Sequence, residues 1–249
     1  GKAAVVHSAR NLVLRNCYFH HNIRSLVAAD GVAGDILVEF CEFEADGYGT
    51  FGPTTLYSKV PRATAVVQHC YFHSNTGNHL LRMGYPRNVI RYNWFEDQCH
   101  FAVQITTPSL FGDKDDTALP DKWLPAHSDI LGNVFVSGWG SNTYGALQIG
   151  GSSRESPGTE GEFNVAYNLF IGRRGGEASF IPIATHGNVD KINVWNNVFL
   201  DCCCGGCKVY ERDQTWDDLS RSAAFKRKRG RDDPVVQGAN NWISKSATG

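Results

Sequence analysis

The sequence has no long hydrophobic run and almost no net charge. Its longest apolar runs, such as Ser25–Ala29 and Ser179–Ala184, are far shorter than the ~18 residues that a membrane-spanning helix requires. Lys and Arg total 24 against 25 Asp and Glu, so the formal net charge is -1. A chain this close to neutrality has no overall field that would attract nucleic acid or an anionic membrane. The sequence therefore predicts no membrane span and no nucleic-acid partner.

Several common sequence signatures are also missing. No apolar spacing of 3.6 residues is sustained, which argues against amphipathic helices. The chain contains no phosphate-binding glycine loop, no GxSxG, no HExxH and no N-x-Ser/Thr acceptor. What remains is a chain of 249 residues with 42% hydrophobic residues, which excludes intrinsic disorder and suits one globular or solenoid domain over residues 1–249.

A short phrase recurs along almost the whole chain. It consists of β-branched or apolar residues, then Asn or Cys, then any residue, then an aromatic, as in LVLRNCYF ending at Phe19. The Asn/Cys position falls at Cys17, Cys41, Cys70, Asn93, Asn133, Asn168, Asn197 and Asn240, with gaps of 24, 29, 23, 40, 35, 29 and 43 residues. The short gaps define a repeating unit, and the long gaps indicate inserted loops.

Each phrase alternates apolar and polar residues, which is the pattern of a half-buried strand. A unit of about 23 residues cannot bury its own apolar face, so successive units must stack on one another. The sequence therefore predicts an all-β parallel β-helix, a solenoid of about eight coils. Repeated Asn residues would form an internal hydrogen-bonded ladder, and Cys17, Cys41 and Cys70 would be stacked core thiols rather than metal ligands.

The eight phrases, from Asn11 to Trp242, resemble the right-handed parallel β-helix repeat proteins and the pectate-lyase-like superfamily. The stretches EADGYGTFGPTTLYSK and HCYFHSNTGNHLLRMGYPRNVIRYNWF resemble a bacterial subgroup with GDGYTHNIY and GHxxKSR-type segments, which has no assigned reaction. Arg82 stands where that subgroup has Lys, and Gln104 where it usually has Asp. The resemblance implies a right-handed solenoid that is secreted or on the cell surface.

The strand after each phrase predicts a candidate site. If Leu56, Leu81, Val103 and Leu147 point inward, the residues that alternate with them along the same strands point outward. Lys59, Arg82, Gln104 and Gln148 would then form one exposed column, with Tyr57, Leu80, Ala102 and Ala146 beside it. A line of polar side chains at strand spacing suits an extended polymer, and a polysaccharide is the partner that we expect.

The expected chemistry is β-elimination from a uronate sugar. This reaction needs a group that neutralises the carboxylate, a base for the adjacent proton and an acid for the leaving oxygen. The resemblance to polysaccharide lyases implies a Lys or Arg base, with Ca²⁺ or a cation as neutraliser. Lys59 would be the base and Arg82 the carboxylate ligand, with His79 and His100 as alternative proton carriers. The alternative is that these are solvated side chains without a catalytic role.

Three insertions are expected to interrupt the repeats, at 106–127, 151–162 and 201–236. The first contains Trp123, which could stack on a sugar ring, and the cluster Asp113, Asp115 and Asp116, a candidate Ca²⁺ site. The acidic residues lack the spacing of a helix-loop-helix calcium site, so a solvated acidic loop is the competing interpretation.

The third insertion contains a cysteine cluster and a basic run. Cys202, Cys203, Cys204 and Cys207 are dense enough for disulfides or a zinc site, and the lack of a second ligand pair favours disulfides. KRKRGR at Lys226–Arg231 is flanked by acidic residues, which favours a solvated loop over a nucleic-acid signal.

Two functions remain open from the sequence. One is an extracellular β-helix that binds or cleaves a polysaccharide, with a uronan lyase as its sharpest form. The other is a non-catalytic structural, adhesive or filament-forming module that assembles through the solenoid ends. Gly1–Arg10 is short and polar and the chain stops in ISKSATG, so the ends suit either a longer parent protein or an assembly.

Overall fold

The structure is a computed structural model, and it describes ten segments of the chain. These are residues 4–28, 34–46, 54–60, 63–106, 126–138, 145–149, 161–172, 180–185, 189–202 and 235–244. The fold and the site are described for these residues only.

The described strands form three sheets, and every pairing between neighbouring strands is parallel. Sheet A contains β1 (Val5–His7), β4 (Leu26–Ala28), β7 (Leu56–Lys59), β10 (Leu81–Gly84), β13 (Phe101–Ile105), β16 (Gly145–Ile149) and β19 (Ile181–Thr185). Sheet B contains β2 (Asn11–Arg15), β5 (Asp35–Glu39), β8 (Thr64–Gln68), β11 (Arg87–Arg91), β14 (Ala126–Leu131), β17 (Gly161–Ala166), β20 (Lys191–Trp195) and β22 (Val235–Ala239). Sheet C contains β3 (Tyr18–His20), β6 (Glu42–Glu44), β9 (Tyr71–His73), β12 (Trp94–Phe95), β15 (Val134–Val136), β18 (Leu169–Ile171), β21 (Val198–Leu200) and β23 (Trp242–Ile243).

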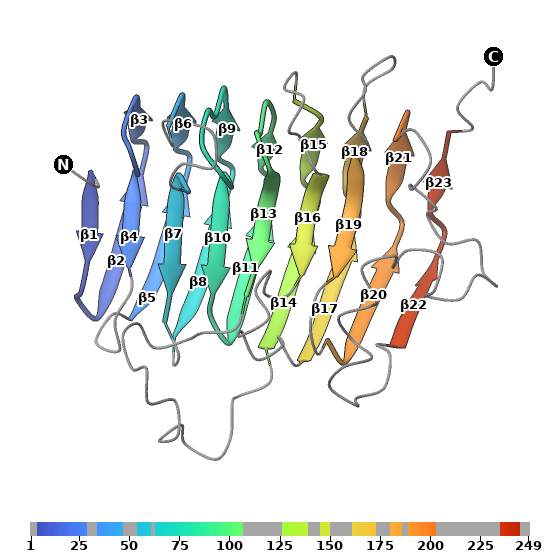
Figure 1. The fold of residues 1–249 in the computed structure, drawn as a ribbon. Helices are drawn as coiled ribbons and strands as arrows, with labels where there is room; N and C mark the ends of the chain where they lie inside the picture. The colour runs from blue at the N-terminus through green and yellow to red at the C-terminus, as the bar shows by residue number, and fades with distance from the viewer. Residues whose placement is uncertain are drawn as a thin grey trace, which may run out of the picture.

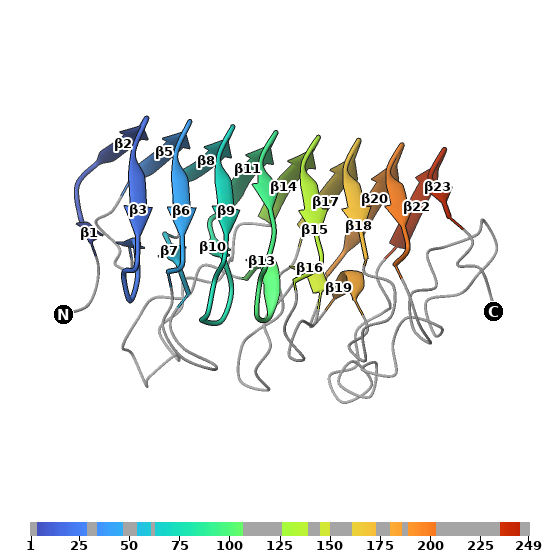
Figure 2. The same cartoon turned by 90° about the horizontal axis from the view of Figure 1, so that it is seen from above.

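The chain visits the three sheets in turn, and each circuit stacks on the one before. The molecule is therefore a right-handed parallel β-helix of about eight coils, as the repeats predict (Figure 1). Seen from above, successive coils follow one another in a row, with β1 and β23 at opposite ends (Figure 2). The described residues include no helix, and so none that is long and apolar enough to cross a membrane.

The recurring aromatic of the phrase forms the centre of the core. Phe43, Phe72, Phe95, Phe135, Phe170 and Phe199 are fully buried, and Phe19 begins the same column. Neighbouring rings stack with centroids 4.6 to 5.1 Å apart, close to the spacing of adjacent strands. One sequence position per coil thus supplies a continuous ring stack along the axis.

The Asn residues form the predicted ladder. Asn133 Oδ1 accepts hydrogen bonds from the backbone N and Nδ2 of Asn93, each at 3.0 Å, and Asn133 Nδ2 donates to the Ile90 carbonyl at 2.9 Å. Asn168 and Asn197 repeat this arrangement. The last rung is Asn241, which accepts from Asn197, and the prediction of Asn240 was wrong by one residue. Asn240 occupies the left-handed bend before the rung, with φ of 56°.

A single left-handed residue makes the bend between sheets B and C in each coil. The column is Asn16, Phe40, His69, Tyr92, Gly132, Tyr167, Asn196 and Asn240, with φ between 53° and 64°. Asn and Gly adopt this conformation at little cost, whereas Phe and Tyr do not. Gly132 is also required by space, because a Cβ there would lie 2.7 Å from the Tyr92 ring.

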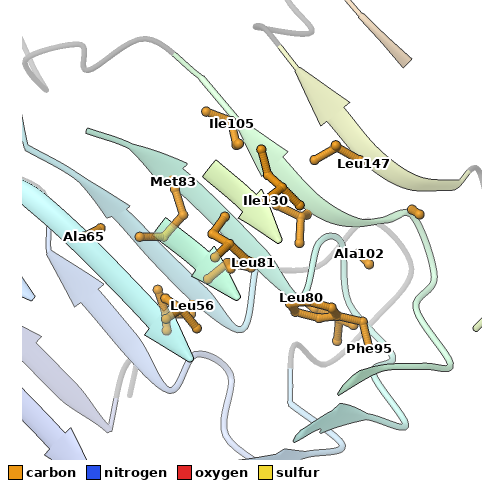
Figure 3. Packing of buried hydrophobic residues seen from close by; sticks show 14 of the residues in the cluster. Leu56, Ala65, Leu80, Leu81, Met83, Phe95, Ala102, Ile105, Ile130 and Leu147 are labelled. Carbon is orange, nitrogen blue, oxygen red and sulfur yellow. The ribbon is translucent and has the colours of Figure 1, made fainter. Parts of the chain in front are cut away.

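In sheet A, the residues predicted to point inward are buried. Leu56, Leu81, Met83, Val103, Ile105, Leu147 and Ile149 all belong to the core. Figure 3 shows Leu56, Leu81 and Met83 among side chains from the other sheets, including Ile130 and Phe95. The parity of the sheet, and hence the choice of outer face, was predicted correctly.

Each of the three predicted insertions ends inside a strand rather than before it. The expected ranges 106–127, 151–162 and 201–236 each run two residues into the strand that follows, namely β14, β17 and β22. Ala126, Gly161 and Val235 already pair with the neighbouring strand of sheet B. The interiors of these insertions, at 107–125, 150–160 and 203–234, lie outside the described residues.

Candidate functional site

The outer face of sheet A carries a column of large polar side chains. The strand register pairs Tyr57 with Arg82, Arg82 with Gln104, and Gln104 with Gln148. Val27 precedes Tyr57 in this column and Ala184 follows Gln148. Because parallel neighbours lie about 4.8 Å apart, four consecutive coils present Tyr, Arg, Gln and Gln along one line.

Two arginines approach the Tyr57 ring. The guanidinium carbon of Arg82 lies 5.3 Å from the ring centroid, and that of Arg24 lies 5.7 Å from it. Such cation–π contacts hold a guanidinium in place and leave its N–H groups able to bind an anion. Burial raises the pKa of Tyr57 and lowers the pKa of Arg82, and the nearby guanidinium charges oppose the shift at Tyr57. Arg82 is half-buried, and its guanidinium remains a cation at neutral pH.

Two histidines lie beside this column, where the chain turns from sheet C into sheet A. His100 Nδ1 is 3.1 Å from His79 Nε2, so the two rings share a hydrogen bond. His79 is buried and His100 is half-buried. Burial holds the pKa of His79 well below its usual value, and the neighbouring His100 and Arg82 lower it further. His79 is therefore uncharged at neutral pH and can act as a hydrogen-bond partner or proton acceptor.

The same cluster contains buried polar atoms without hydrogen-bond partners. Gln104 is 0% exposed and Gln148 is 1% exposed. Both amide atoms of Gln104, Gln148 Oε1, His79 Nδ1 and Arg82 Nε have no partner in the described structure. A buried polar group without a partner costs about 1–3 kcal/mol, so five in adjacent residues mark a place where water or a polar ligand would be bound favourably.

Lys59 does not belong to the column. Its backbone pairs with Gly84, and Tyr57 occupies the position beside Arg82. The prediction that Lys59 and Arg82 lie on adjacent rungs was therefore wrong by two residues. A shift of two leaves the inward and outward parity unchanged, so the hydrophobic pattern cannot detect it.

The predicted exposure of the column was also wrong. Gln104 and Gln148 are buried, as are Ala102 and Ala146 beside them. Of the large polar residues of the column, Tyr57 and Arg82 are partly exposed, and Arg24 and His100 beside them are partly exposed too. A ligand that approaches this face therefore meets the arginines, the tyrosine ring and His100 first.

Other predicted residues lie elsewhere or outside the described residues. Trp123, the cluster Asp113, Asp115 and Asp116, and the thiols Cys203, Cys204 and Cys207 fall in the undescribed insertions. Cys202 is half-buried, with Sγ 3.6 Å from the Phe170 carbonyl. The described part of the chain contains no disulfide and no group of three or more His, Cys, Asp or Glu side chains that could hold a metal ion.

Sequence reasoning missed a second surface feature, a groove along the bend between sheets B and C. It has a volume of about 830 Å³, and its floor is formed by Cys17, Cys41, Cys70 and Asn93. Its walls are the residues before and after each rung, Asn16, Phe40, His69, Tyr92 and Gly132 on one side and Tyr18, Glu42, Tyr71, Trp94 and Val134 on the other. The signal was present in the sequence, because at least one aromatic residue lies directly beside the Asn/Cys position in each of the first four phrases.

Comparison with known proteins gives no match. No family model, curated protein or solved structure matches this chain. The site is therefore interpreted from its own geometry.

Proposed function

We propose that the protein binds an acidic polysaccharide outside the cell and cleaves it by β-elimination on the outer face of sheet A. The proposal includes a relation to the pectate-lyase-like superfamily. The observation that carries it is the cationic cluster of Arg24 and Arg82 around Tyr57, next to the hydrogen-bonded pair of His79 and His100, of which His79 is uncharged. The cations can neutralise the uronate carboxylate and a histidine can remove the adjacent proton, which are two of the three roles that β-elimination requires.

In this proposal Arg82 binds the uronate carboxylate. A guanidinium can donate two parallel hydrogen bonds to a carboxylate, and its charge stabilises the electron density that builds up when the adjacent proton leaves. The Tyr57 ring holds the guanidinium from one side, so the Arg82 side chain loses little conformational entropy when it binds a carboxylate. Arg24 adds a second cation on the same ring.

In this proposal the base is His100 rather than Lys59. His100 is the half-exposed member of the pair, and His79 positions it through the 3.1 Å hydrogen bond. His100 takes the proton from the carbon next to the carboxylate, the bond to the leaving oxygen breaks, and that oxygen takes a proton from water. The products are an unsaturated uronide and a shortened chain. Because His79 stays unprotonated, it does not repel a proton that arrives at His100.

The test is to follow the ultraviolet absorbance of unsaturated uronides with pectic, alginate and glycosaminoglycan polymers, with and without Ca²⁺. We expect rising absorbance on one polymer, and at least about a hundredfold slower turnover for Arg82→Gln and His100→Gln. Arg91→Gln is a matched control, because Arg91 also contacts a tyrosine ring, at 5.9 Å, but belongs to sheet B. A flat trace with folded wild-type protein on every polymer would overturn the elimination chemistry.

A second candidate function is end-to-end assembly, and one observation favours it. The first coil is less covered than the second: Leu12, Leu14, Cys17 and Phe19 are only partly buried, whereas their counterparts Ile36, Val38, Cys41 and Phe43 are buried. Half-exposed core positions at an open strand edge are typical of a surface that another coil could cover.

Assembly predicts a concentration-dependent increase in mass in sedimentation experiments. Substituting Leu12 or Leu14 by Lys, which places a charge on that edge, should return the protein to the monomer. A wild-type protein that stays monomeric at high concentration would contradict assembly through this edge.

A further inference from the structure

Exposed aromatic side chains gather along one edge of the solenoid, where sheet B turns into sheet C. Among the described residues, seven Phe, Tyr and Trp side chains are at least 38% exposed, and six of these lie in two columns at this edge. The bend column contains Phe40, Tyr92 and Tyr167, and the first column of sheet C contains Tyr18, Trp94 and Trp242. Aromatic rings that are gathered on one surface, rather than scattered, are typical of a binding surface.

The groove of about 830 Å³ lies between these two columns. It passes β3, β6, β9 and β12, which follow one another along one side of the solenoid, and reaches Val134 of β15 (Figure 2). Five coils at the strand spacing give it a length of about 19 Å. The thiols of Cys41 and Cys70 in its floor donate to the carbonyls of Glu39 and Gln68, at 3.3 and 3.2 Å. The groove therefore suits an extended chain that is recognised by its walls.

The sheet C wall turns ring faces toward the groove. The Tyr18 ring stacks on His20 with centroids 4.9 Å apart, and the Tyr71 ring stacks on His73 with centroids 4.2 Å apart. Each histidine lies two residues further along the same strand, so it covers the ring face that points away from the bend. The opposite face of each tyrosine is turned back toward the bend and the groove.

Carboxylates hold these rings in place. The Tyr18 hydroxyl donates to Glu44, and the Tyr71 hydroxyl donates to Glu96. Trp94 Nε1 donates to the other oxygen of Glu96 at 2.7 Å. The polar tip of each ring is therefore fixed while its apolar body lines the groove, and a ligand that stacks on these rings does not have to order them first.

The bend wall consists of aromatic rings at a backbone conformation that does not favour them. Phe40, His69 and Tyr92 stack on one another along the axis, with centroids 5.0 and 5.3 Å apart. Phe40 and Tyr92 have φ of 53° and 57°, although Asn16 and Asn196 show that Asn fits this column. Their side chains are 54% and 55% exposed, so burial does not explain them. Strained and exposed rings beside a groove indicate a ligand that uses them.

The charges beside the groove exclude an anionic ligand. Glu42 belongs to the sheet C wall, with a side chain that is 47% exposed, and Glu44 and Glu96 anchor the neighbouring rings. On the opposite wall, Arg91 lies 5.9 Å from the Tyr92 ring. Carboxylates outnumber arginines here, so this groove repels the uronate polymer that the outer face of sheet A is proposed to bind.

The backbone of the groove offers little to an extended peptide. The N–H groups of Glu42, Tyr71 and Trp94 each donate to a carbonyl of the preceding coil, at 2.9 Å. A peptide therefore has no open strand edge to pair with along this line. A sugar chain needs no such edge, because the C–H faces of pyranose rings stack on aromatic rings and the hydroxyls donate to carboxylates.

We propose that this groove binds a neutral polysaccharide chain, at a site separate from the outer face of sheet A. Sugar rings stack on Tyr18, Tyr71 and Trp94, and Glu42 accepts hydrogen bonds from their hydroxyls. The groove breaks no bond and holds the chain along the solenoid axis. This site does not depend on elimination chemistry at Arg82 and His100.

The experiment titrates the full chain with hexasaccharides of β-1,4-linked glucose, xylose and mannose, and with hexagalacturonate, by calorimetry. We expect at least one neutral hexasaccharide to bind, and Trp94→Ala to weaken its binding at least about tenfold. Trp242→Ala is the matched control, because Trp242 is an exposed tryptophan in the same column of sheet C but does not line the groove. Its affinity should equal that of the wild type.

A second variant separates binding from folding. Phe40→Asn places a residue that suits the left-handed bend, so it should unfold at no lower urea concentration than the wild type and still bind the sugar more weakly. Arg82→Gln should bind the neutral hexasaccharide with unchanged affinity, and a tenfold excess of hexagalacturonate should not displace it. Equal affinities for the wild type and Trp94→Ala would overturn the proposal, as would binding of hexalysine without binding of any neutral hexasaccharide.

Discussion

At the scale of single residues, the Asn ladder is the feature with the largest expected energetic effect. Asn168 accepts two hydrogen bonds from Asn133 and donates one to the Ile130 carbonyl, all at 2.9 to 3.0 Å and all buried. We expect Asn168→Ala to lower the free energy of unfolding by about 2–4 kcal/mol, because it leaves several buried polar groups without partners. Urea denaturation measures the difference.

The matched control for this substitution is Asn164→Ala. Asn164 is on the same coil but half-exposed on the outer face of sheet B, where it bonds to Asp129 and Asn193. Water can replace those partners, so we expect a loss below about 1 kcal/mol. Equal losses in the two variants would show that the ladder has no special role.

The left-handed bend residues predict a stabilising substitution. Tyr167 has φ of 59°, and its side chain is 68% exposed, so it gains little from burial. The equivalent residues Asn16, Asn196 and Asn240 show that Asn fits this bend. We expect Tyr167→Asn to raise the free energy of unfolding by about 0.5–1 kcal/mol, measured by thermal or urea denaturation. Tyr167→Val, which adds β-branching at positive φ, should instead destabilise the protein.

At the scale of strands and sheets, parity could be predicted from the sequence but register could not. Alternation identifies Leu81, Met83 and Leu147 as inward residues, because one face of each strand must be buried. The register between β7 and β10 depends on the path of the chain that connects them. A shift of two residues gives the same alternation of inward and outward residues. This is why Tyr57, rather than Lys59, lies beside Arg82.

Sheet B carries a polar column that predicts a pH dependence of stability. Arg15 and Glu39 form an ion pair, Gln68 donates to Glu39 at 2.7 Å, and Arg91 donates to Gln68 at 2.8 Å. The hydrogen bond from Gln68, followed by that from Arg15, lowers the pKa of Glu39 below its ordinary value of 4.5. The stabilisation is therefore present above pH 4.5 and is lost as the pH falls below it.

Glu39→Gln tests that assignment. The variant should show a smaller loss of stability between pH 5 and pH 3 than the wild type, because one titrating group is gone. Denaturation midpoints across this range provide the measurement. Glu42→Gln is a comparison on sheet C, and a Glu39→Gln curve parallel to the wild type would contradict a lowered pKa at Glu39.

At the scale of the whole molecule, the repeats predicted the solenoid because every coil has an apolar face that only a neighbouring coil can bury. The Phe column, the rung and the bend recur at fixed positions, so eight weak patterns support one another. The candidate site has no such redundancy. His79 and His100 share a hydrogen bond, but the burial of Gln104 and Gln148 depends on what covers the outer face, which a local sequence pattern does not encode.

The central claim is that Tyr57 and Arg82, in the polar column on the outer face of sheet A, bind a uronate. The most direct test is equilibrium binding of a uronate oligosaccharide to the wild type, Arg82→Gln and Arg91→Gln, by calorimetry at two salt concentrations. The account predicts that Arg82→Gln weakens binding at least about tenfold, that Arg91→Gln does not, and that salt weakens wild-type binding. Equal affinities for the wild type and Arg82→Gln would contradict it.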